Sequence, residues 1–512
     1  MDKRDALRYR IAPLEMTPSE FRKAGRQLVE RIAEFLCTLP ERPVIPHASP
    51  QMARDLLDTG SLPEQGTEAR DLLEEATTLL FAHTTTSGHP RFLGSISSSA
   101  APIGALGDLL AAAVNPNVGG RSGSPIGIAL EEQIIRWIAA LIDYHPTDCG
   151  GLLVSGSTMS NFAGLLAARQ AKSTWQARTA GVMGEGARRL RVYTSSETQT
   201  WIQKAVDMFG LGTDAIRWIP VDTRLRMDPI TLRTLVQEDI EAGDLPFLVI
   251  GTAGTVSTGA VDPLPALAAV CREFDLWFHV DGAYGAFAAL LLHEHQGVEV
   301  PTDLGGISLA DSVAVDPHTW LYAPLEAGCI LVRDQQALRE TFSAHPPSSH
   351  ETLEALAALH DDEYRGQTAR GFPALKVWLA LRQVGRVGYA EMIADDIRLA
   401  QELYRLAEAH SELQAFTQGL SITTFRYIPP GLIPGSEEVE SYLTSLNTEL
   451  LQRLQRGGEA ILSHAVVRGT FLLRACVVNF RTSLEDIEAL PILVTRIGRE
   501  VDTAMRPGNL NT

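Results

Sequence analysis

The chain has 512 residues, 45% of them hydrophobic, and its 62 acidic residues against 44 basic ones give a formal charge of −18. This length favours two or more domains around a sizeable core. The negative charge argues against nucleic-acid binding, which needs clustered cations to meet the phosphates.

The five cysteines lie far apart without a C-x-x-C pair, so neither a disulfide framework nor a zinc cluster is expected. The N-terminus lacks the apolar stretch of a secretion signal, and no apolar run is long enough to span a bilayer. We therefore expect a cytoplasmic protein that does not enter a membrane.

The first predicted element is an amphipathic helix after Thr17-Pro18-Ser19-Glu20, a sequence typical of a capping box. Its apolar positions include Phe21, Leu28, Ile32 and Phe35, and Pro40 follows its end. The next segment, 84–114, is rich in Gly and Ser, which indicates a loop that approaches another part of the chain closely and then a helix.

Between about 150 and 334, seven short apolar runs alternate mostly with amphipathic segments. This alternation predicts a largely parallel or mixed sheet with helices on both faces. The runs are "GLLVSG", "RVYTSS", "AIRWIPVD", "FLVIGTAG", "LWFHVDG", "SVAVDP" and "AGCILVRD". Polar residues end several runs, and ligands of such sheets bind beyond the carboxyl ends of the strands, so we expect the site there.

The C-terminal part mixes helices with short strand-like runs, "LSITTFRYI" and "FLLRACVVNF". This mixture predicts a smaller α+β domain. We expect an N-terminal helical segment at 1–85, a large α/β domain at 86–389 and a C-terminal α+β domain at 390–512.

Several motifs in the same order along the chain resemble the group II pyridoxal-phosphate (PLP) decarboxylases, the family of aromatic-amino-acid, tyrosine and glutamate decarboxylases. The motifs are "GHPRFLGS" at 88–95, "GTAGTVSTGAVDPL" at 251–264, "HVDGAYGAF" at 279–287, "VDPHTWLYAPLEAGCILVRD" at 315–334 and "ALKVWLALRQVGRVGY" at 374–389. The resemblance implies the fold-type I, aspartate-aminotransferase-like architecture. It also implies a homodimer whose segment 1–85 packs across the partner and whose active sites lie at the interface.

The resemblance assigns ancestral cofactor positions to four residues. Asp281 matches the aspartate that bonds the pyridinium nitrogen, and Ala283 matches the small residue beneath the ring. Ser157 and Thr158 match the phosphate-binding turn at a helix N-terminus. Without the resemblance, Asp281 is equally well explained as a helix cap and "SGST" as an ordinary turn.

Thr319 stands where the resemblance leads us to expect the lysine that forms an imine with the cofactor aldehyde. A hydroxyl forms no stable imine, so the anchoring, the loading of substrate and the ammonium acid are lost together. The other lysines offer no evident replacement: Lys376, in "ALKVW", matches a separate family lysine with a structural role.

Further departures accompany Thr319. Gln199 takes the place of a ring-stacking histidine, Val256 that of a threonine and Pro373 that of an arginine. The segment "HPPSSHETLEALAALHDDEY" replaces a Tyr-rich loop expected to close over substrate. So many changes around one pocket favour natural divergence over a single engineered change.

The remaining polar residues suggest a cavity that could still carry out chemistry. It would be lined by Asp281, His318, His89, Glu197, Gln199 and Thr319. Asp281 and His318 are the acid and base candidates, whereas Thr319 as a nucleophile needs a neighbouring base. The alternative is that these groups only satisfy one another's hydrogen bonds. His293 and His295 fall on different faces of a helix, so we expect no metal site.

These observations leave three functional hypotheses. In the first, the pocket carries out PLP-independent chemistry on a small molecule, and no cofactor is expected. In the second, the chain is an inactive pseudoenzyme that binds a ligand or a partner subunit. In the third, a carboxy-lyase retains PLP without a covalent bond. We favour the first slightly.

Overall fold

The computed structural model describes residue 8 and residues 12–46, 49–57, 61–119, 123–294, 296–342 and 369–510. The larger of its two sheets has the strand order β1-β7-β6-β5-β4-β2-β3. Its strands are β1 (Gly150–Val154), β2 (Leu190–Ser195), β3 (Ile216–Ile219), β4 (Leu245–Thr252), β5 (Trp277–Asp281), β6 (Ser312–Val315) and β7 (Gly328–Val332). β7 runs antiparallel to both of its neighbours and the remaining pairs are parallel, so the predicted seven-stranded, mostly parallel sheet is confirmed.

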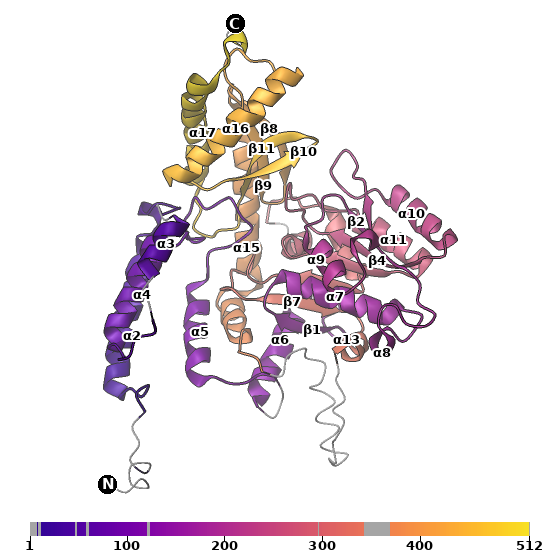
Figure 1. Cartoon of the computed structure of the whole chain (residues 1–512), viewed down its shortest axis with the longest axis horizontal. Helices are drawn as coiled ribbons and strands as arrows, with labels where there is room; N and C mark the ends of the chain where they lie inside the picture. The colour runs from indigo at the N-terminus through magenta and orange to yellow at the C-terminus, as the bar shows by residue number, and fades with distance from the viewer. Residues whose placement is uncertain are drawn as a thin grey trace.

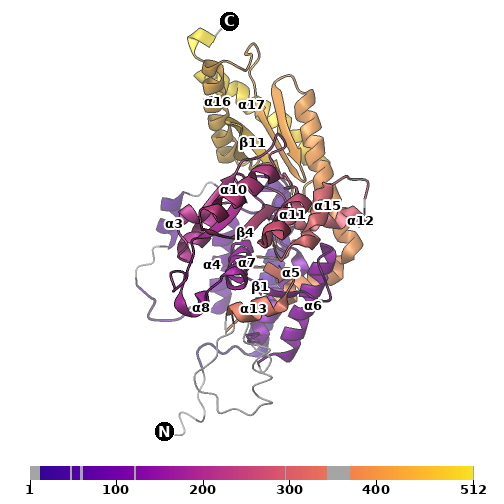
Figure 2. The ribbon, with the colours of Figure 1, turned by 90° about the vertical axis from the view of Figure 1, so that its right-hand side faces the viewer.

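Helices cover both faces of this sheet, as Figures 1 and 2 show. The helices up to the last strand of this sheet are α2 (Pro18–Cys37), α3 (Pro50–Leu57), α4 (Ala69–His83), α5 (Pro102–Val114), α6 (Pro125–Leu141), α7 (Ser157–Lys172), α8 (Ala177–Ala180), α9 (Trp201–Met208), α10 (Pro229–Glu241), α11 (Leu264–Phe274) and α12 (Leu291–Glu294). After it come α13 (Gln335–Phe342), α15 (Ala374–Ala409), α16 (Glu437–Gly457) and α17 (Leu484–Met505).

Alternate residues of each strand belong to different hydrophobic clusters, because side chains of a strand point to opposite faces in turn. Val249 of β4 joins a cluster with α6, α10, α11 and α15, whereas its neighbours Leu248 and Ile250 join one with α7, α9 and α13. The result is a three-layer α/β domain.

A second, antiparallel sheet forms the core of the C-terminal part, with the order β10-β11-β9-β8. Its strands are β8 (Leu413–Gly419), β9 (Ile422–Tyr427), β10 (Ser463–Val467) and β11 (Thr470–Cys476), and α16 and α17 pack beside them. The long helix α15 connects the two parts and has non-helical dihedral angles at Gly385. The domain boundary expected at 389/390 lies close to that break and stays a prediction.

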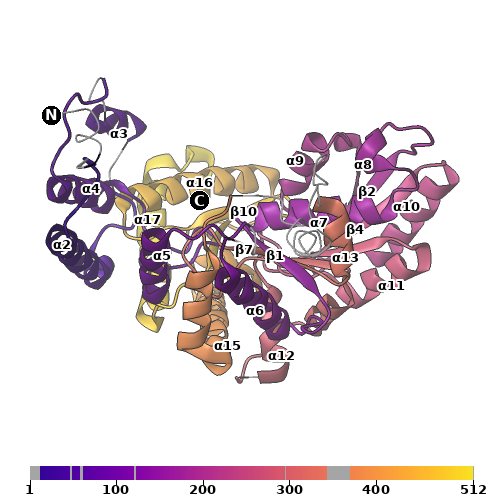
Figure 3. The ribbon, with the colours of Figure 1, turned by 90° about the horizontal axis from the view of Figure 1, so that it is seen from below.

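The N-terminal helices stand beside this body (Figures 1 and 3). The predicted capping box is present: the Thr17 hydroxyl accepts from the Glu20 N–H, and the Glu20 carboxylate accepts from the Thr17 N–H. α2 pairs with α4 through stacked rings of Phe35 and Phe81, whose centroids are 4.1 Å apart. No residue of α2 is buried within this chain.

The loop at 84–101 makes the close approach that its small residues predicted. A Cβ atom at Gly94 would lie 2.9 Å from the backbone carbon of Leu462, so a larger residue would push the loop away from β10. This contact brings residues 94–96 to the boundary between the two sheets.

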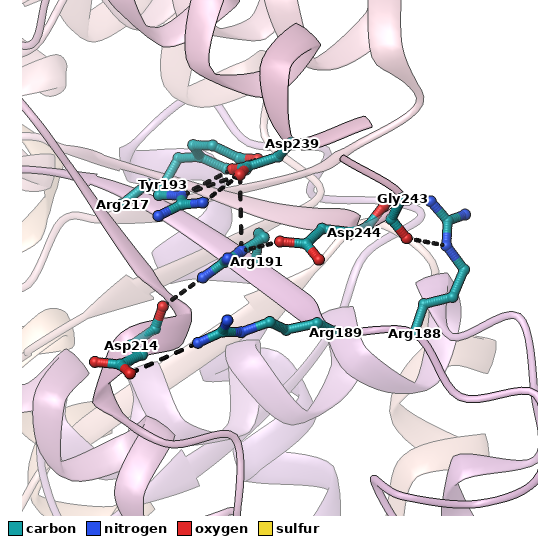
Figure 4. A network of polar contacts seen from close by, with 9 residues as sticks. All are labelled: Arg188, Arg189, Arg191, Tyr193, Asp214, Arg217, Asp239, Gly243 and Asp244. Carbon is teal, nitrogen blue, oxygen red and sulfur yellow. Dashed lines mark hydrogen bonds and ion pairs between the residues drawn. The ribbon is translucent and has the colours of Figure 1, made fainter. Parts of the chain in front are cut away.

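A charged network fixes the amino end of β2 and its neighbours, far from the carboxyl ends (Figure 4). Asp239 of α10 accepts from the Tyr193 hydroxyl at 2.7 Å and from Arg217 Nε at 2.9 Å. Arg191 Nε donates to Asp244 at 2.6 Å. Burial and the Asp239 carboxylate raise the pKa of Tyr193, which therefore stays a neutral donor. The network ties α10, β2 and β3 together and plays a structural part.

Within the described ranges, none of the helices combines the length and low polarity needed to cross a membrane. All five cysteines are free thiols, as their spacing predicted.

Candidate functional site

A cavity of about 450 Å³ lies at the carboxyl ends of β4, β5 and β6, between the large sheet and β10 and β11. It is lined by Gly94, Ser95, Ile96, Ser157, Glu197, Gln199, Thr252, Gly254, Val256, Ser257, Asp281, Ala283, Tyr284, Asp316, Thr319, Ser463, His464 and Arg474. The site therefore lies at the edge of the sheet where the strand pattern placed it.

Asp281 ends β5 and is 7% exposed. Its Oδ2 accepts from Trp201 Nε1 at 2.8 Å, and its Oδ1 accepts from the Ala283 N–H at 3.2 Å. Burial raises the pKa of Asp281, while hydrogen bonds from Trp201, Ala283 and Asn161 act in the opposite direction. These donors let the carboxylate remain in the interior, where an unpaired charge is unfavourable.

The N-terminus of α7 meets the cavity at Ser157, the first residue of the helix. Asp316 lies beside it. Burial raises the pKa of Asp316 to about 6, although hydrogen bonds from the His318 N–H and from the N–H and hydroxyl of Ser157 oppose this shift. Thr158, the second residue predicted for the phosphate turn, is not among the lining residues.

Thr319 lines the cavity, but its hydroxyl is already engaged. Oγ1 lies 2.7 Å from the carbonyl oxygen of Asp316 and 3.1 Å from that of Ala283, and it donates its single proton to these acceptors. Neither contact is with a base that could activate it, so the geometry gives no support to a nucleophilic role.

No lysine of the described residues lines the cavity. Lys376 Nζ instead donates to Asp108 at 3.2 Å and to the Leu325 carbonyl at 3.0 Å, which is the structural role expected for it. Lys172 pairs with Asp275.

The two histidines proposed as site residues lie outside the cavity lining. Both ring nitrogens of His318 are used, with Nδ1 2.8 Å from the Ala323 carbonyl and Nε2 2.9 Å from Ser97 Oγ. His89 Nδ1 accepts from the Arg91 N–H at 2.9 Å. The expectation that both line the cavity is therefore wrong, because hydrogen bonds to Ser97, Ala323 and Arg91 hold the two rings outside the lining; their catalytic role stays a prediction.

Glu197 and Gln199 do line the cavity, as expected. Burial raises the pKa of Glu197, and a hydrogen bond from Ser257 opposes the shift. Glu197 is thus a carboxyl group that can hold a proton closer to neutral pH than an exposed glutamate can.

Arg474 of β11 was missed by the sequence reasoning. It is 3% exposed, and its Nη1 donates to Ser463 Oγ at 3.0 Å, but its buried Nε and Nη2 have no hydrogen-bond partner among the described residues. The buried Oγ1 of Thr252, also on the cavity wall, is unpartnered too. Buried polar atoms without partners are rare, and two of the residues that carry them, Arg474 and Thr252, line this cavity.

In the described part of the chain, no group of three or more His, Cys, Asp and Glu side chains is arranged to hold a metal ion. His293 lies 3.6 Å from Asp143, and His295 lies outside the described residues.

Known proteins are similar to this chain over nearly its whole length. The model of the "pyridoxal-dependent decarboxylase conserved domain" matches residues 50–428. An aromatic-L-amino-acid decarboxylase from Bacillus atrophaeus is 30% identical over 95% of this chain and 97% of its own length. A phenylacetaldehyde synthase from a Rosa hybrid cultivar is 27% identical over 90% of each chain. The chain therefore belongs to the pyridoxal-dependent decarboxylase family.

Solved structures of similar proteins also superpose on nearly the whole of this chain. Mouse CSAD superposes with a TM-score of 0.85 at 26% identity, covering 94% of this chain and 99% of its own. Oryza sativa TDC with PLP and tryptamine gives the same TM-score and identity over 96% and 99%. These structures confirm the fold-type I architecture.

The expectation that the chain uses no cofactor is wrong, since its family is PLP-dependent and a similar structure contains PLP. The family and its relatives likewise give no support to PLP-independent chemistry. The lining residues fit a cofactor held without a covalent bond: Asp281 can face a ring nitrogen, Ala283 is small, and Ser157 begins a helix whose N-terminus favours phosphate. The lining residues include no lysine, so they do not fit covalent attachment of the cofactor to a lysine.

Proposed function

We propose that this protein binds PLP non-covalently and takes a small amino-acid substrate by its carboxylate, as a decarboxylase-family enzyme that works without the anchoring lysine. The observation that carries the proposal is the combination, in one cavity, of Asp281, the N-terminus of α7 and the partly satisfied guanidinium of Arg474 around Thr319.

Three residues would hold the cofactor. The Asp281 carboxylate would accept a hydrogen bond from the ring nitrogen, and Ala283 would leave room beneath the ring. The N-terminus of α7, whose first residue Ser157 donates to Asp316 in the ligand-free protein, would face the phosphate. When bound, PLP supplies an electron sink for negative charge that develops on a substrate carbon.

Arg474 is suited to the substrate carboxylate. Nε and Nη2 of a guanidinium form a planar pair of donors that matches the two oxygens of a carboxylate. Nη1 donates to Ser463 Oγ and to the Gly94 carbonyl, which holds the side chain in place, and the buried Nε and Nη2 have no acceptor among the described residues.

Glu197 is the residue proposed to hold or release a proton. Its carboxyl lines the cavity and its pKa is raised by burial, so the protonated form persists toward neutral pH. The Thr319 hydroxyl, bonded to backbone carbonyls, orients its own loop instead.

The same Thr319 geometry favours one other function, that of a catalytically inactive cofactor-binding subunit. In that case the cavity would bind PLP and the carboxylate but release no product. Product analysis with saturating PLP separates the two functions, because both include binding and only the first includes turnover.

We also propose that the protein assembles as a homodimer. α2 buries no residue within the chain, and α5 exposes about half of each of Leu106, Leu109 and Leu110. Apolar faces of this kind are stabilised by burial against a partner. A second copy of this chain is the expected partner, since α2 belongs to segment 1–85, for which the resemblance implies packing across a dimer; α5 lies outside that segment and adds an exposed apolar face.

The test of the cofactor proposal is a titration with PLP and with pyridoxamine 5′-phosphate, which has no aldehyde. Both should bind reversibly and with similar affinity, because nothing in the cavity captures the aldehyde. Asp281→Asn should weaken the binding of both compounds. Asp303→Asn, a change in a different surface cleft, should leave the binding of both unchanged. Failure of the wild type to bind either compound would contradict the proposal.

A further inference from the structure

Trp201, the first residue of α9, was not singled out by sequence because a tryptophan among apolar residues is ordinarily a core residue. It is 2% exposed and belongs to the cluster between the sheet and α7. Its indole Nε1 donates to Asp281 Oδ2 at 2.8 Å. Its ring also meets the His279 ring edge-on, with centroids 6.2 Å apart.

The Asp281 carboxylate has no cationic partner among the described residues: its hydrogen bonds come from Trp201, the Ala283 N–H and Asn161. An ionised carboxylate in a protein interior needs several such donors. The indole N–H donates to Oδ2 and the Ala283 N–H to Oδ1. A carboxylate has about four acceptor positions, so with the bond from Asn161 these donors leave about one position for a ligand.

We propose that Trp201 is a positioning residue for the cofactor site: its indole N–H fixes the Asp281 carboxylate and keeps its charge directed at a protonated ring nitrogen. This inference rests on the proposed function, because the ring nitrogen belongs to the proposed cofactor.

A purely structural role for Trp201 can be separated from this one, because the same core contains a matched residue. Trp277 is also buried in this cluster, and its Nε1 donates to a neutral acceptor, Ser312 Oγ, at 2.8 Å. Replacing either tryptophan by phenylalanine removes a similar apolar volume and one indole hydrogen bond. Only the Trp201 change removes a donor from a charged group that lines the cavity.

The experiment uses 4′-deoxypyridoxine 5′-phosphate, which lacks the aldehyde and whose ultraviolet spectrum reports the protonation of the ring nitrogen. The wild type and Trp277→Phe should bind it with the nitrogen protonated to high pH. Trp201→Phe should bind about 10-fold more weakly, as expected for a lost charge-assisted hydrogen bond, and should release the ring proton at lower pH. Equal behaviour of the two variants would overturn the inference.

A second measurement tests Trp201 without any ligand. In a ¹⁵N-indole spectrum of the protein, whose seven tryptophans include Trp201, the signal lost in Trp201→Phe should shift in Asp281→Asn. It should also shift with pH as Asp281 titrates. A Trp201 signal insensitive to both changes would overturn the inference. Failure of the wild type to bind the probe, with the expected indole shifts present, would count against the proposed function alone.

Discussion

Arg474→Met should affect stability and ligand affinity in opposite directions. Methionine keeps an unbranched, apolar side chain of similar reach but removes the charge and all five N–H donors. In the ligand-free protein, two buried nitrogens of Arg474, Nε and Nη2, have no partner among the described residues, and the third, Nη1, donates to Ser463 Oγ and to the Gly94 carbonyl.

The magnitudes follow from these contacts. A buried donor without a partner costs about 1–3 kcal/mol, whereas a satisfied hydrogen bond contributes about 1 kcal/mol. With two such nitrogens and two hydrogen bonds of Nη1 lost, removing the guanidinium should leave the free energy of unfolding unchanged or raise it by up to about 4 kcal/mol. A carboxylate that accepts from both Nε and Nη2 should lose at least about 3 kcal/mol, which corresponds to roughly 100-fold in affinity.

The assay compares two stable phosphopyridoxyl amines, one made from glycine and one from methylamine, which differ by the carboxylate. The wild type should prefer the glycine compound strongly, and Arg474→Met should lose the preference while denaturing no earlier than the wild type. Arg468→Met, in the same hairpin and bonded to the Thr223 carbonyl, is the control and should keep the preference. If Arg474→Met is strongly destabilised and both compounds weaken equally, Arg474 is a structural residue and the reasoning is refuted.

Four further predictions concern other parts of the molecule. Thr319→Lys should give a PLP adduct that borohydride traps, and a variant that binds PLP but is never trapped would show that position 319 cannot reach the aldehyde. Because burial raises the pKa of Glu197, pyridoxamine phosphate binding should depend on pH below neutrality, and Glu197→Gln should lose that dependence; identical profiles would remove Glu197 from proton transfer. Burial raises the pKa of Asp396 to about 7, so the folded protein holds this proton more tightly than the unfolded chain does. The resulting stabilisation is complete below the ordinary aspartate pKa and is lost as the pH rises through 7. Asp396→Asn, which can still accept from the Tyr322 hydroxyl, should be the more stable protein at pH 8, by at most about 4 kcal/mol, and a lower denaturation midpoint there would contradict this. Leu109→Glu on α5 should convert a dimer into a monomer at micromolar concentration, as measured by sedimentation, and an unchanged dimer would place the interface elsewhere.

Local sequence patterns were sufficient for the architecture. Each of the seven apolar runs forms a strand, and all of them except the edge strand β3, where Trp218 is exposed, are buried on both faces over most of their length. The Thr17 capping box forms as expected because its partners are three residues apart and need no tertiary structure.

The side-chain directions within the site were not predictable in the same way. His318 follows a strand end that reaches the cavity, yet its ring bonds to Ser97 and Ala323, and the contact with Ser97 joins segments far apart in sequence. Trp201 and Arg474 come from α9 and β11, so their convergence on the Asp281 site depends on packing between elements. A charged residue within the apolar run "FLLRACVVNF" was the available signal for Arg474.

The expectation about the cofactor failed for a different reason. Loss of the imine lysine removes covalent anchoring, but Asp281 and the N-terminus of α7 at Ser157, which we propose hold the cofactor, still line the cavity. Retention of a cofactor and its covalent attachment are separate properties. Thr319 in the sequence bears on covalent attachment alone.

The most direct test of the account is intact-mass analysis of PLP-saturated wild-type protein after borohydride reduction and denaturation, together with the stoichiometry of bound PLP beforehand. The account predicts about one PLP per chain before denaturation and an unmodified protein mass afterwards. A phosphopyridoxyl group retained on any lysine, or a folded protein that binds no PLP at saturating concentration, would contradict it.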